Sequence, residues 1–353
     1  MKYRTDDTRI IGMEEVDAPE ILIRDHPISD AASEFVFTTR SAISDIVHGR
    51  DDRLLVVVGP CSIHDPKAAL EYGGRLKKEA ERWKESLQIV MRVYFEKPRT
   101  TVGWKGLVND PHLNESFSIN EGLRLARGLL DDLVEMGLAT GTEYLDPISP
   151  QYFADLVCWG AIGARTTESQ VHRQLASGLS CPIGFKNSTL GSIQVAVDAV
   201  RASRSSHIFL SVTKEGRSAI FSTAGNDDCH IILRGGRGET NYDAESVGAA
   251  TELLERAGLP PHLMIDLSHA NSAKEFQRQL QVCADVCAQL RAGSKAIMGV
   301  MIESNLVEGA QKLGADEELV YGRSITDGCI GWEDTQSCLE ELAMATRARN
   351  ESR

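Results

Sequence analysis

Four side chains of the kinds that bind transition metals lie far apart in the sequence. They are Cys61, His269, Glu303 and Asp327. A thiolate, an imidazole and two carboxylates form a mixed set of donors that suits a divalent transition metal. No local spacing links these residues, so the prediction of a metal site depends on a fold that brings four segments together.

Each of these residues also has an ordinary structural explanation. A single cysteine is more often an inert buried thiol than a ligand, and His269 could simply cap a helix. Glu303 and Asp327 could be surface charges. His64 and Asp65 lie closer to Cys61 in the sequence and are rival ligands, although Asp65 is better suited to a helix cap.

A second group of candidate functional residues is basic. It consists of Arg92, Lys97, Arg99, Lys105, Arg165, Lys186 and Arg234. If these cations share one site they repel one another unless anions bind between them, and guanidinium groups suit carboxylate and phosphate. The alternative for any single residue is an ion pair with a carboxylate such as Glu143 or Glu168. Together the cations predict anionic substrates, held beside a metal that binds a carbonyl or water oxygen.

The elements that must position both groups begin with residues 54–58, a continuous apolar run. This pattern is typical of a strand that is buried on both faces of a parallel sheet. Gly59 and Pro60 end the run, and Asp65-Pro66 is typical of a helix start. Further strands are predicted near residues 87–94, 140–145, 161–164, 182–185, 230–233, 263–267 and 296–302.

Buried strands that alternate with helices in this way predict an α/β fold, a (β/α)8 TIM barrel. In such a barrel the candidate residues, which follow the strands, face a single opening. A doubly wound open sheet is the structural alternative, but it would not readily gather every strand end around one mouth.

Two segments are additions to the barrel. Residues 1–49 precede the first strand and contain a helix predicted from about Ser29 to His48. Residues 207–222 look like an inserted β-hairpin. We therefore expect an N-terminal extension, residues 1–49, and a barrel, residues 50–353, that carries the hairpin. The spacing of Ser272 and Glu275 also predicts that a helix starts there.

Composition narrows the class of protein. The chain has 353 residues, and 42% of them are hydrophobic, which is enough for a large core. Its net charge of −13 argues against nucleic acid or an anionic membrane as a partner. No apolar stretch reaches transmembrane length, and the N-terminus lacks the apolar core of a signal peptide. The 8 cysteines are scattered singly, which favours reduced thiols and a cytoplasmic location.

Six longer motifs resemble the type I 3-deoxy-D-arabino-heptulosonate 7-phosphate (DAHP) synthases, microbial enzymes of the shikimate pathway. The motifs are Gly59-Pro-Cys-Ser-Ile-His-Asp65, Phe95-Glu-Lys-Pro-Arg-Thr-Thr-Val-Gly-Trp-Lys-Gly106, Gly160-Ala-Ile-Gly-Ala-Arg-Thr-Thr-Glu-Ser-Gln170, Gly184-Phe-Lys-Asn187, Ile232-Leu-Arg-Gly-Gly236 and Asp266-Leu-Ser-His-Ala-Asn271. The resemblance covers nearly the whole chain, and motifs of this length are highly specific.

The resemblance implies condensation of phosphoenolpyruvate with erythrose 4-phosphate and water, release of phosphate, and a divalent metal (manganese, iron, cobalt or zinc). The implied metal ligands are Cys61, His269, Glu303 and Asp327. Phosphoenolpyruvate would contact Arg92, Lys97, Ala164, Arg165, Lys186 and Arg234. Erythrose 4-phosphate would contact Lys97, Pro98, Arg99, Thr100 and Asp327. Catalytic roles fall to Lys97, Glu143 and Lys186.

The resemblance also implies feedback inhibition by an aromatic amino acid, and assembly into homodimers or homotetramers. The N-terminal extension and the hairpin would then serve regulation and oligomerisation. The implied effector pocket consists of Asp6, Asp7, Pro150, Gln151, Leu175, Leu179, Ser180, Phe209, Ser211 and Phe221. Ser211 resembles the phenylalanine-sensitive branch, whereas Pro147 and Phe221 depart from it, so tyrosine and tryptophan stay open as effectors. Without the resemblance, Leu175, Leu179 and Phe209 would be ordinary core residues.

Three other functions compete with this one. The nearest is the related condensation of phosphoenolpyruvate with arabinose 5-phosphate, against which the Lys97-Pro-Arg-Thr100 stretch and the long N-terminal extension weigh. A metal-dependent phosphohydrolase would fit the fold and the site. A non-catalytic amino-acid sensor is the third, but it would not need a full set of ligands or Lys97.

Overall fold

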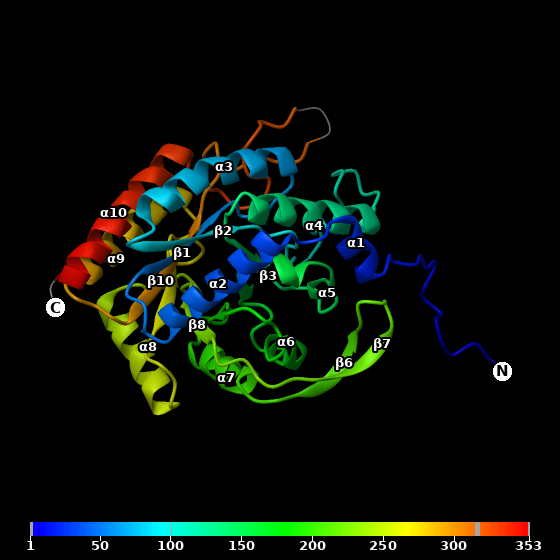
Figure 1. Ribbon diagram of the computed structural model, residues 1–353, viewed down its shortest axis with the longest axis horizontal. Coiled ribbons are helices and arrows are strands. Elements are labelled where there is room, and N and C mark those ends of the chain that lie inside the picture. The colour runs from blue at the N-terminus through cyan, green and yellow to red at the C-terminus, as the bar shows by residue number, and fades with distance from the viewer. Residues whose placement is uncertain (1–2, 100, 315–317, 352–353) are drawn as a thin grey trace.

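Eight parallel strands close into a barrel in the computed structural model, which describes residues 3–99, 101–314 and 318–351 (Figure 1). The strands follow the order β1-β10-β9-β8-β5-β4-β3-β2 around the barrel. Their bounds are β1 (Leu54–Gly59), β2 (Leu87–Arg92), β3 (Thr140–Glu143), β4 (Trp159–Ile162), β5 (Ile183–Lys186), β8 (Cys229–Leu233), β9 (Leu263–Asp266) and β10 (Ile297–Glu303). The predicted (β/α)8 barrel is confirmed, and the open-sheet alternative is wrong.

The first strand shows why the sequence forms a barrel. All six residues of β1 are buried, as expected for a strand with side chains on both faces covered. It pairs with β2 on one side and with β10 on the other, so the chain closes on itself. Because Gly59 pairs with Glu303 across β1 and β10, the loop that carries Cys61 leaves the barrel beside Glu303.

Helices cover the outside of the barrel and one of its ends. They are α1 (Pro19–Asp25), α2 (Asp30–Val47), α3 (Pro66–Trp83), α4 (Ile119–Glu135), α5 (Pro150–Phe153), α6 (Gln170–Ala176), α7 (Gln194–Ser203), α8 (Ala244–Arg256), α9 (Gln279–Arg291) and α10 (Trp332–Glu351), with short 3-10 helices at Ala154–Leu156 and Phe276–Arg278. Helix α2 covers the amino-terminal end of the barrel: its Arg40 donates to the carbonyl of Val157 before β4, and His48 lies 2.9 Å from Asp228 before β8. The opposite end stays open for the candidate residues.

The N-terminal arm, residues 3–18, extends away from the barrel (Figure 1). The predicted hairpin is confirmed as β6 (Ile208–Val212) and β7 (Ser218–Ser222), which pair antiparallel and lie on the same side of the barrel as the arm. The two additions meet where the amide of Glu20 donates to the carbonyl of Lys214 at 2.8 Å.

One predicted helix start is wrong, and several predicted strand boundaries are wrong by one or two residues. The segment from Ser272 to Glu275 is a turn rather than a helix start, because Ala273 and Lys274 have left-handed backbones with φ of 52° and 62°. Helix α9 begins only at Gln279, after a 3-10 helix. The fourth strand begins at Trp159, two residues before the predicted position.

No helix in the described parts of the chain is long and apolar enough to cross a membrane.

Helix α4 packs unusually close to the loop that precedes it, and this contact gives a testable prediction. A Cβ at Gly122 would lie 2.3 Å from the Val108 carbonyl oxygen, so Gly122→Ala is expected to destabilise the protein by about 2 kcal/mol, although alanine normally favours helices. Gly248 in α8 is the matched control because a Cβ there meets nothing within 4 Å, and Gly248→Ala should stabilise by ~0.5–1 kcal/mol. Urea unfolding of both variants measures the two effects. Equal effects of the two substitutions would contradict the close packing.

Candidate active site

The donors of Cys61, Glu303 and Asp327 meet at the open end of the barrel, where each residue offers one atom within 4.8 Å of the other two. Cys61 and Glu303 are buried, and Asp327 is exposed. The Cys61 Sγ lies 3.7 Å from Asp327 Oδ2. Asp327 reaches the site because a hydrogen bond of 2.7 Å between Ser62 and Thr326 ties its loop to the one that follows β1.

His269 lies beside this group. Its Nε2 is 3.9 Å from Glu303 Oε1, and its Nδ1 is 2.9 Å from Asp266 Oδ2. A carboxylate on one ring nitrogen is the usual way in which proteins orient a histidine whose other nitrogen binds a metal. His269 is not among the donors that all lie within 4.8 Å of one another, so an ion bound by all four would draw them closer together.

The two rival ligands are not part of the group. Asp65 caps α3, as the sequence indicated, since its carboxylate accepts hydrogen bonds from the amides of Lys67 and Ala68. His64 is absent from the cluster of donors, and burial lowers the pKa of its imidazole. The donors that do meet, a thiol and carboxylates beside an imidazole, fit a divalent transition metal.

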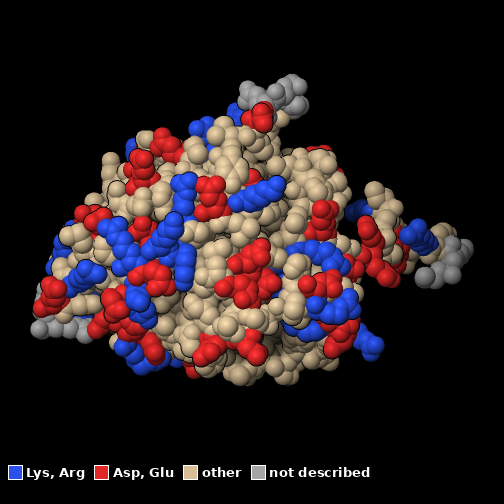
Figure 2. Space-filling model, turned by 45° about the horizontal axis from the view of Figure 1, so that its top comes forward, with Lys and Arg blue, Asp and Glu red and all other residues tan. Residues whose placement is uncertain are grey.

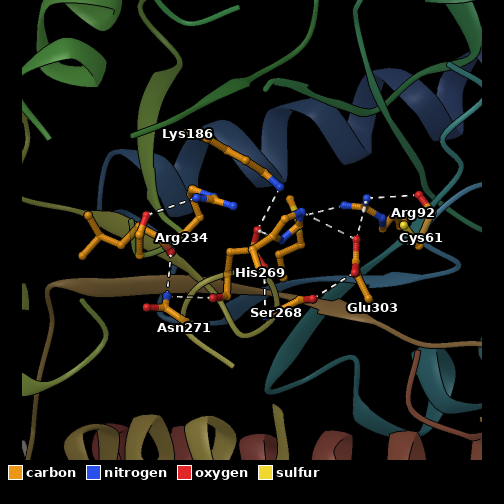
Figure 3. Close-up of polar contacts among 12 residues, drawn as sticks. Cys61, Arg92, Lys186, Arg234, Ser268, His269, Asn271 and Glu303 are labelled. Atoms are coloured by element: carbon orange, nitrogen blue, oxygen red, sulfur yellow. Dashed lines mark hydrogen bonds and ion pairs between the residues drawn. The ribbon is translucent and has the colours of Figure 1, made fainter. Parts of the chain in front are cut away.

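Glu303 is completely buried and carries its charge inside the protein. Its carboxylate accepts hydrogen bonds from Arg92 at 3.1 Å and from Ser268 at 2.9 Å (Figure 3). Burial opposes ionisation, but the positive charges of His269, Arg92 and Lys97 outweigh it and lower the pKa of Glu303 to about 2. The carboxylate is therefore ionised and ready to bind a cation at neutral pH.

Two cations surround the Cys61 thiol. Lys97 Nζ lies 3.1 Å from Cys61 Sγ, and Arg92 donates to the Cys61 carbonyl while its guanidinium lies over the Tyr94 ring. Burial raises the pKa of Cys61, and the charge of Glu303 adds to this effect more than Lys97 offsets it. A metal ion would supply the additional positive charge that a thiolate needs in this position.

A second carboxylate, Asp266, holds Lys186 and His269 together. Its Oδ2 lies 2.8 Å from Lys186 Nζ and 2.9 Å from His269 Nδ1. Burial would raise the pKa of Asp266, but His269 and Lys186 hold it well below its usual value. Sequence reasoning missed Asp266, although it begins the motif that contains His269.

A cavity of about 740 Å³ opens above these groups. The cavity is lined by all six residues that the resemblance assigns to phosphoenolpyruvate: Arg92, Lys97, Ala164, Arg165, Lys186 and Arg234. Four of the residues assigned to erythrose 4-phosphate also line it, namely Lys97, Pro98, Arg99 and Asp327. Thr100 lies outside the described residues, and Lys105 is exposed and does not line the cavity. In Figure 3, Lys186 and Arg234 lie on one side of His269, and Arg92, Cys61 and Glu303 lie on the other.

Glu143 ends β3 and faces the same cavity. A Cβ at Gly163 would lie 2.1 Å from its Oε1, so the glycine on the neighbouring strand's exit leaves room for the carboxylate. The cavity also includes Arg237, Lys274 and Phe276, which sequence reasoning did not assign. Arg237 directly follows the Arg234-Gly-Gly236 motif, which is the sequence signal for it, whereas Lys274 lies in the segment where a helix start is predicted.

Comparisons with known proteins decide the family. The family model described as DAHP synthetase I family matches residues 26–340. The chain belongs to this family. It is 60% identical over 349 residues to the "Phospho-2-dehydro-3-deoxyheptonate aldolase, Phe-sensitive" of Escherichia coli K12, and the match covers 99% of each chain. A Trp-sensitive relative from Salmonella typhimurium is 52% identical over 98% of this chain and 99% of its own.

A solved structure of the same fold supports this assignment. The phospho-2-dehydro-3-deoxyheptonate aldolase of Francisella tularensis SCHU S4 superposes with a TM-score of 0.94 and is 53% identical, covering 96% of this chain and 99% of its own. Enzymes of the family catalyse the first step of the shikimate pathway. The recognition made from six motifs is therefore confirmed.

The residues assigned to the effector pocket fall into two places. Around the hairpin, Lys214 donates to the carbonyl of Gln151, and Thr223 lies 2.7 Å from Ser177 between Leu175 and Leu179. These contacts place the turn of the hairpin beside Gln151 in α5 and its far end beside Ser177, which follows α6. Within the hairpin, Phe209 pairs with Phe221, and their ring centroids lie 6.2 Å apart. Asp6 and Asp7 lie apart on the exposed arm, where their backbone carbonyls accept hydrogen bonds from Arg4.

A buried acid next to Lys97 makes the stability of the protein depend on pH. Burial raises the pKa of Glu96 to about 8, although Ser149 donates a hydrogen bond of 2.9 Å to its carboxyl group. The folded protein therefore keeps this proton up to about pH 8, whereas the unfolded chain loses it near the ordinary value. Stability is expected to fall with rising pH between those two values and to level off above.

Glu96→Gln should remove this decline because the amide stays neutral. Between about pH 5 and pH 8, the free energy of unfolding of the wild type should fall more steeply than that of the variant, by about 1 kcal/mol per pH unit. Glu255→Gln, at an exposed position of α8, is the control and should keep the wild-type slope. Parallel curves for the wild type and Glu96→Gln would rule out a neutral Glu96.

Proposed function

We propose that the cavity condenses phosphoenolpyruvate with erythrose 4-phosphate and water to give 3-deoxy-D-arabino-heptulosonate 7-phosphate and phosphate. The observation that carries the proposal is a cavity lined by Arg92, Lys97, Arg165, Lys186 and Arg234 directly beside the donors of Cys61, Glu303 and Asp327. Both substrates are anions, and phosphoenolpyruvate carries a carboxylate and a phosphate for several guanidinium and ammonium groups to bind.

The basic residues bind and orient the two substrates. Arg165, Lys186 and Arg234 hold phosphoenolpyruvate with its methylene carbon toward the aldehyde, so the reaction gains mainly from proximity. Lys97, Pro98 and Arg99 hold erythrose 4-phosphate on the adjacent wall. A bound divalent metal, held by Cys61, His269, Glu303 and Asp327, would supply Lewis acidity toward the aldehyde oxygen.

Proton transfers fall to three side chains that face the cavity. When the new carbon–carbon bond forms, positive charge develops on the carbon that bears the phosphate ester. Glu143 and Lys186 position the water that attacks this carbon, after which phosphate leaves. Lys97, whose ammonium group lies at the bottom of the cavity beside Cys61, donates a proton to the new alkoxide.

Manganese, iron, cobalt and zinc are the proposed metals because each accepts a thiolate together with imidazole and carboxylate ligands. Removing metal with a chelator should abolish turnover of phosphoenolpyruvate and erythrose 4-phosphate, and manganese should restore it. Cys61→Ala should lose bound metal, measured by elemental analysis after dialysis, and lose activity by more than about a hundredfold. Cys158→Ala is the control because Cys158 is equally buried but precedes β4, at the other end of the barrel.

Full turnover by metal-free protein would overturn the metal site. Phosphate release with arabinose 5-phosphate instead of erythrose 4-phosphate would favour the related condensation. Release from phosphoenolpyruvate alone would favour a phosphohydrolase, and no release with either sugar would favour a non-catalytic sensor.

We also propose that residues 1–49 and the hairpin form a regulatory and oligomerisation part attached to a catalytic barrel, residues 50–353. Apolar side chains on the arm and on one face of the hairpin are exposed, among them Ile11, Met13, Ile208, Leu210 and Ile220. Exposed apolar surface of this extent supports self-association as a homodimer or homotetramer. The arm projects from a surface on which basic and acidic side chains are interspersed (Figure 2).

Phenylalanine is the proposed effector for two reasons. The segment around Ser211 resembles the phenylalanine-sensitive branch of the family, and a relative named Phe-sensitive is 60% identical to this chain. The effector pocket is proposed at the contact of the hairpin with α5 and α6. A cytoplasmic location is proposed as well, since all eight cysteines are buried and free.

Phenylalanine should therefore inhibit the condensation, and Ser211→Gly should weaken that inhibition several-fold without changing the uninhibited rate. Ser211 is opposite Ala219 in the hairpin, outside the cavity, so a change in the basal rate is not expected. Rates measured against phenylalanine, tyrosine and tryptophan test the choice of effector. Inhibition by tyrosine or tryptophan in the absence of a phenylalanine effect would overturn it.

A further inference from the structure

Three buried asparagines lie side by side where β5, β8 and β9 open into the cavity. Asn187 follows β5 directly, Asn241 lies in the loop between β8 and α8, and Asn271 follows β9. Hydrogen bonds link them in a row across all three strand ends: the Asn241 side chain donates to that of Asn187, and the Asn241 main-chain amide donates to the Asn271 side chain. The proposed chemistry uses none of them, and none of them lines the cavity.

The first two asparagines hold the main chain of residues 234 and 235 from two sides. Asn187 Oδ1 accepts the Arg234 amide at 2.8 Å, and its Nδ2 donates to the Gly235 carbonyl at 3.0 Å. Asn241 Oδ1 accepts the Gly235 amide at 2.7 Å, and its Nδ2 donates to Asn187 Oδ1 at 3.2 Å. Both the donor and the acceptor of the Gly235 peptide are therefore bound by side-chain amides.

The third asparagine connects this arrangement to the next strand. Asn271 Oδ1 accepts the Asn241 amide at 2.8 Å, and its Nδ2 donates to the carbonyls of Leu233 and Asp266 at 3.2 and 2.9 Å (Figure 3). Asp266 is the residue whose carboxylate contacts both Lys186 and His269. The asparagine row thus joins the backbones that carry Lys186, Arg234 and His269.

Arg234 depends on its backbone more than the deeper Arg92 does. The guanidinium of Arg92 is held by Glu303, by two carbonyls and by the Tyr94 ring. In contrast, the buried Nε of Arg234 has no hydrogen-bond partner within the described residues. Among those residues, the one hydrogen bond of the Arg234 side chain runs from Nη1 to the carbonyl of Gly235 at a long 3.4 Å. With so little to hold its side chain, the position of Arg234 is set by its main chain.

The main chain at Gly235 has little room to move. Its φ is +71°, a left-handed conformation, and a Cβ would lie 2.8 Å from both Ala270 Cβ and the Glu239 carbonyl oxygen. The peptide is packed against the loop that carries His269, so a displaced Gly235 peptide would displace Arg234 in the cavity.

We propose that Asn187, Asn241 and Asn271 are positioning residues that fix Arg234 for the anionic groups of phosphoenolpyruvate. The inference rests on the proposed function, in which Arg234 binds that substrate. Buried amide networks also contribute to stability, so a test must separate positioning from folding.

Asn241→Ala removes the centre of the row and is expected to raise KM for phosphoenolpyruvate by about tenfold or more, since small displacements of a binding group are costly. KM for erythrose 4-phosphate should stay within about twofold because Arg99 and Lys97 lie on other strand exits. Asn226→Ala is the matched control. Asn226 is exposed to the same 8% as Asn241 and donates to three carbonyls, of Ala176, Leu179 and Cys181, away from the cavity. It should lose stability with both KM values unchanged.

A double-mutant cycle with Arg234→Ala identifies the residue through which Asn241 acts. If Asn241 works by placing Arg234, the double variant should have the KM for phosphoenolpyruvate of Arg234→Ala alone. Calorimetric titration with phosphoenolpyruvate gives the same comparison without turnover. Should Asn241→Ala fail to fold, Asn241→Ser keeps a hydroxyl that can accept the Gly235 amide, and the cycle is run on that variant.

The possible outcomes distinguish the two proposals. An unchanged KM for phosphoenolpyruvate in a folded Asn241 variant, equal changes in both KM values, or additive effects in the cycle would each overturn the positioning role. A wild-type protein that neither binds nor consumes phosphoenolpyruvate would instead overturn the proposed function.

Discussion

The site depends on one buried charge, the carboxylate of Glu303. A lone carboxylate in the interior is costly, and here Arg92 and Ser268 each donate a hydrogen bond to it while His269 and Lys97 add positive charge. These partners come from β2, from the loop after β9 and from the segment after β2, so closure of the barrel is what assembles them. Glu303 is itself fixed through its backbone, because the Gln279 side chain pairs with both its amide and its carbonyl.

The chain holds its cations in two different ways. The deep ones are paired, Arg92 with Glu303 and Lys186 with Asp266. Those nearer the rim contact backbone carbonyls instead: Arg99 donates to Trp104 and Arg165 to Pro98. Within the described residues no ion pair is made by Arg99, Arg165 or Arg234.

The sequence was sufficient for the barrel because each strand is a short buried apolar run followed by a turn, a local pattern that β1 shows clearly. It also indicated Cys61 and Glu303, since polar residues at the ends of buried strands must face the opening. Asp266 and the asparagine row could not be found in this way, because their roles arise from contacts between segments 30 to 80 residues apart. The false helix start at Ser272 has the same origin: the local spacing is right, but the loop must pass around the cavity and takes a left-handed path at Lys274.

Cations without an ion pair near the rim of the cavity explain how a strongly acidic protein can bind two phosphorylated substrates. A net charge of −13 repels anions at long range, but screening at physiological salt confines that effect to roughly 8 Å, so local charge controls entry into the cavity. Inside, burial lowers the pKa of Arg234, and the charge of Arg165 adds to this effect although Asp266 opposes it. An arriving carboxylate or phosphate relieves this repulsion and satisfies guanidinium donors that the protein leaves free. In the proposed function, the energy for binding therefore comes from the positions of the cations, and the asparagine row holds the backbone that sets the position of Arg234.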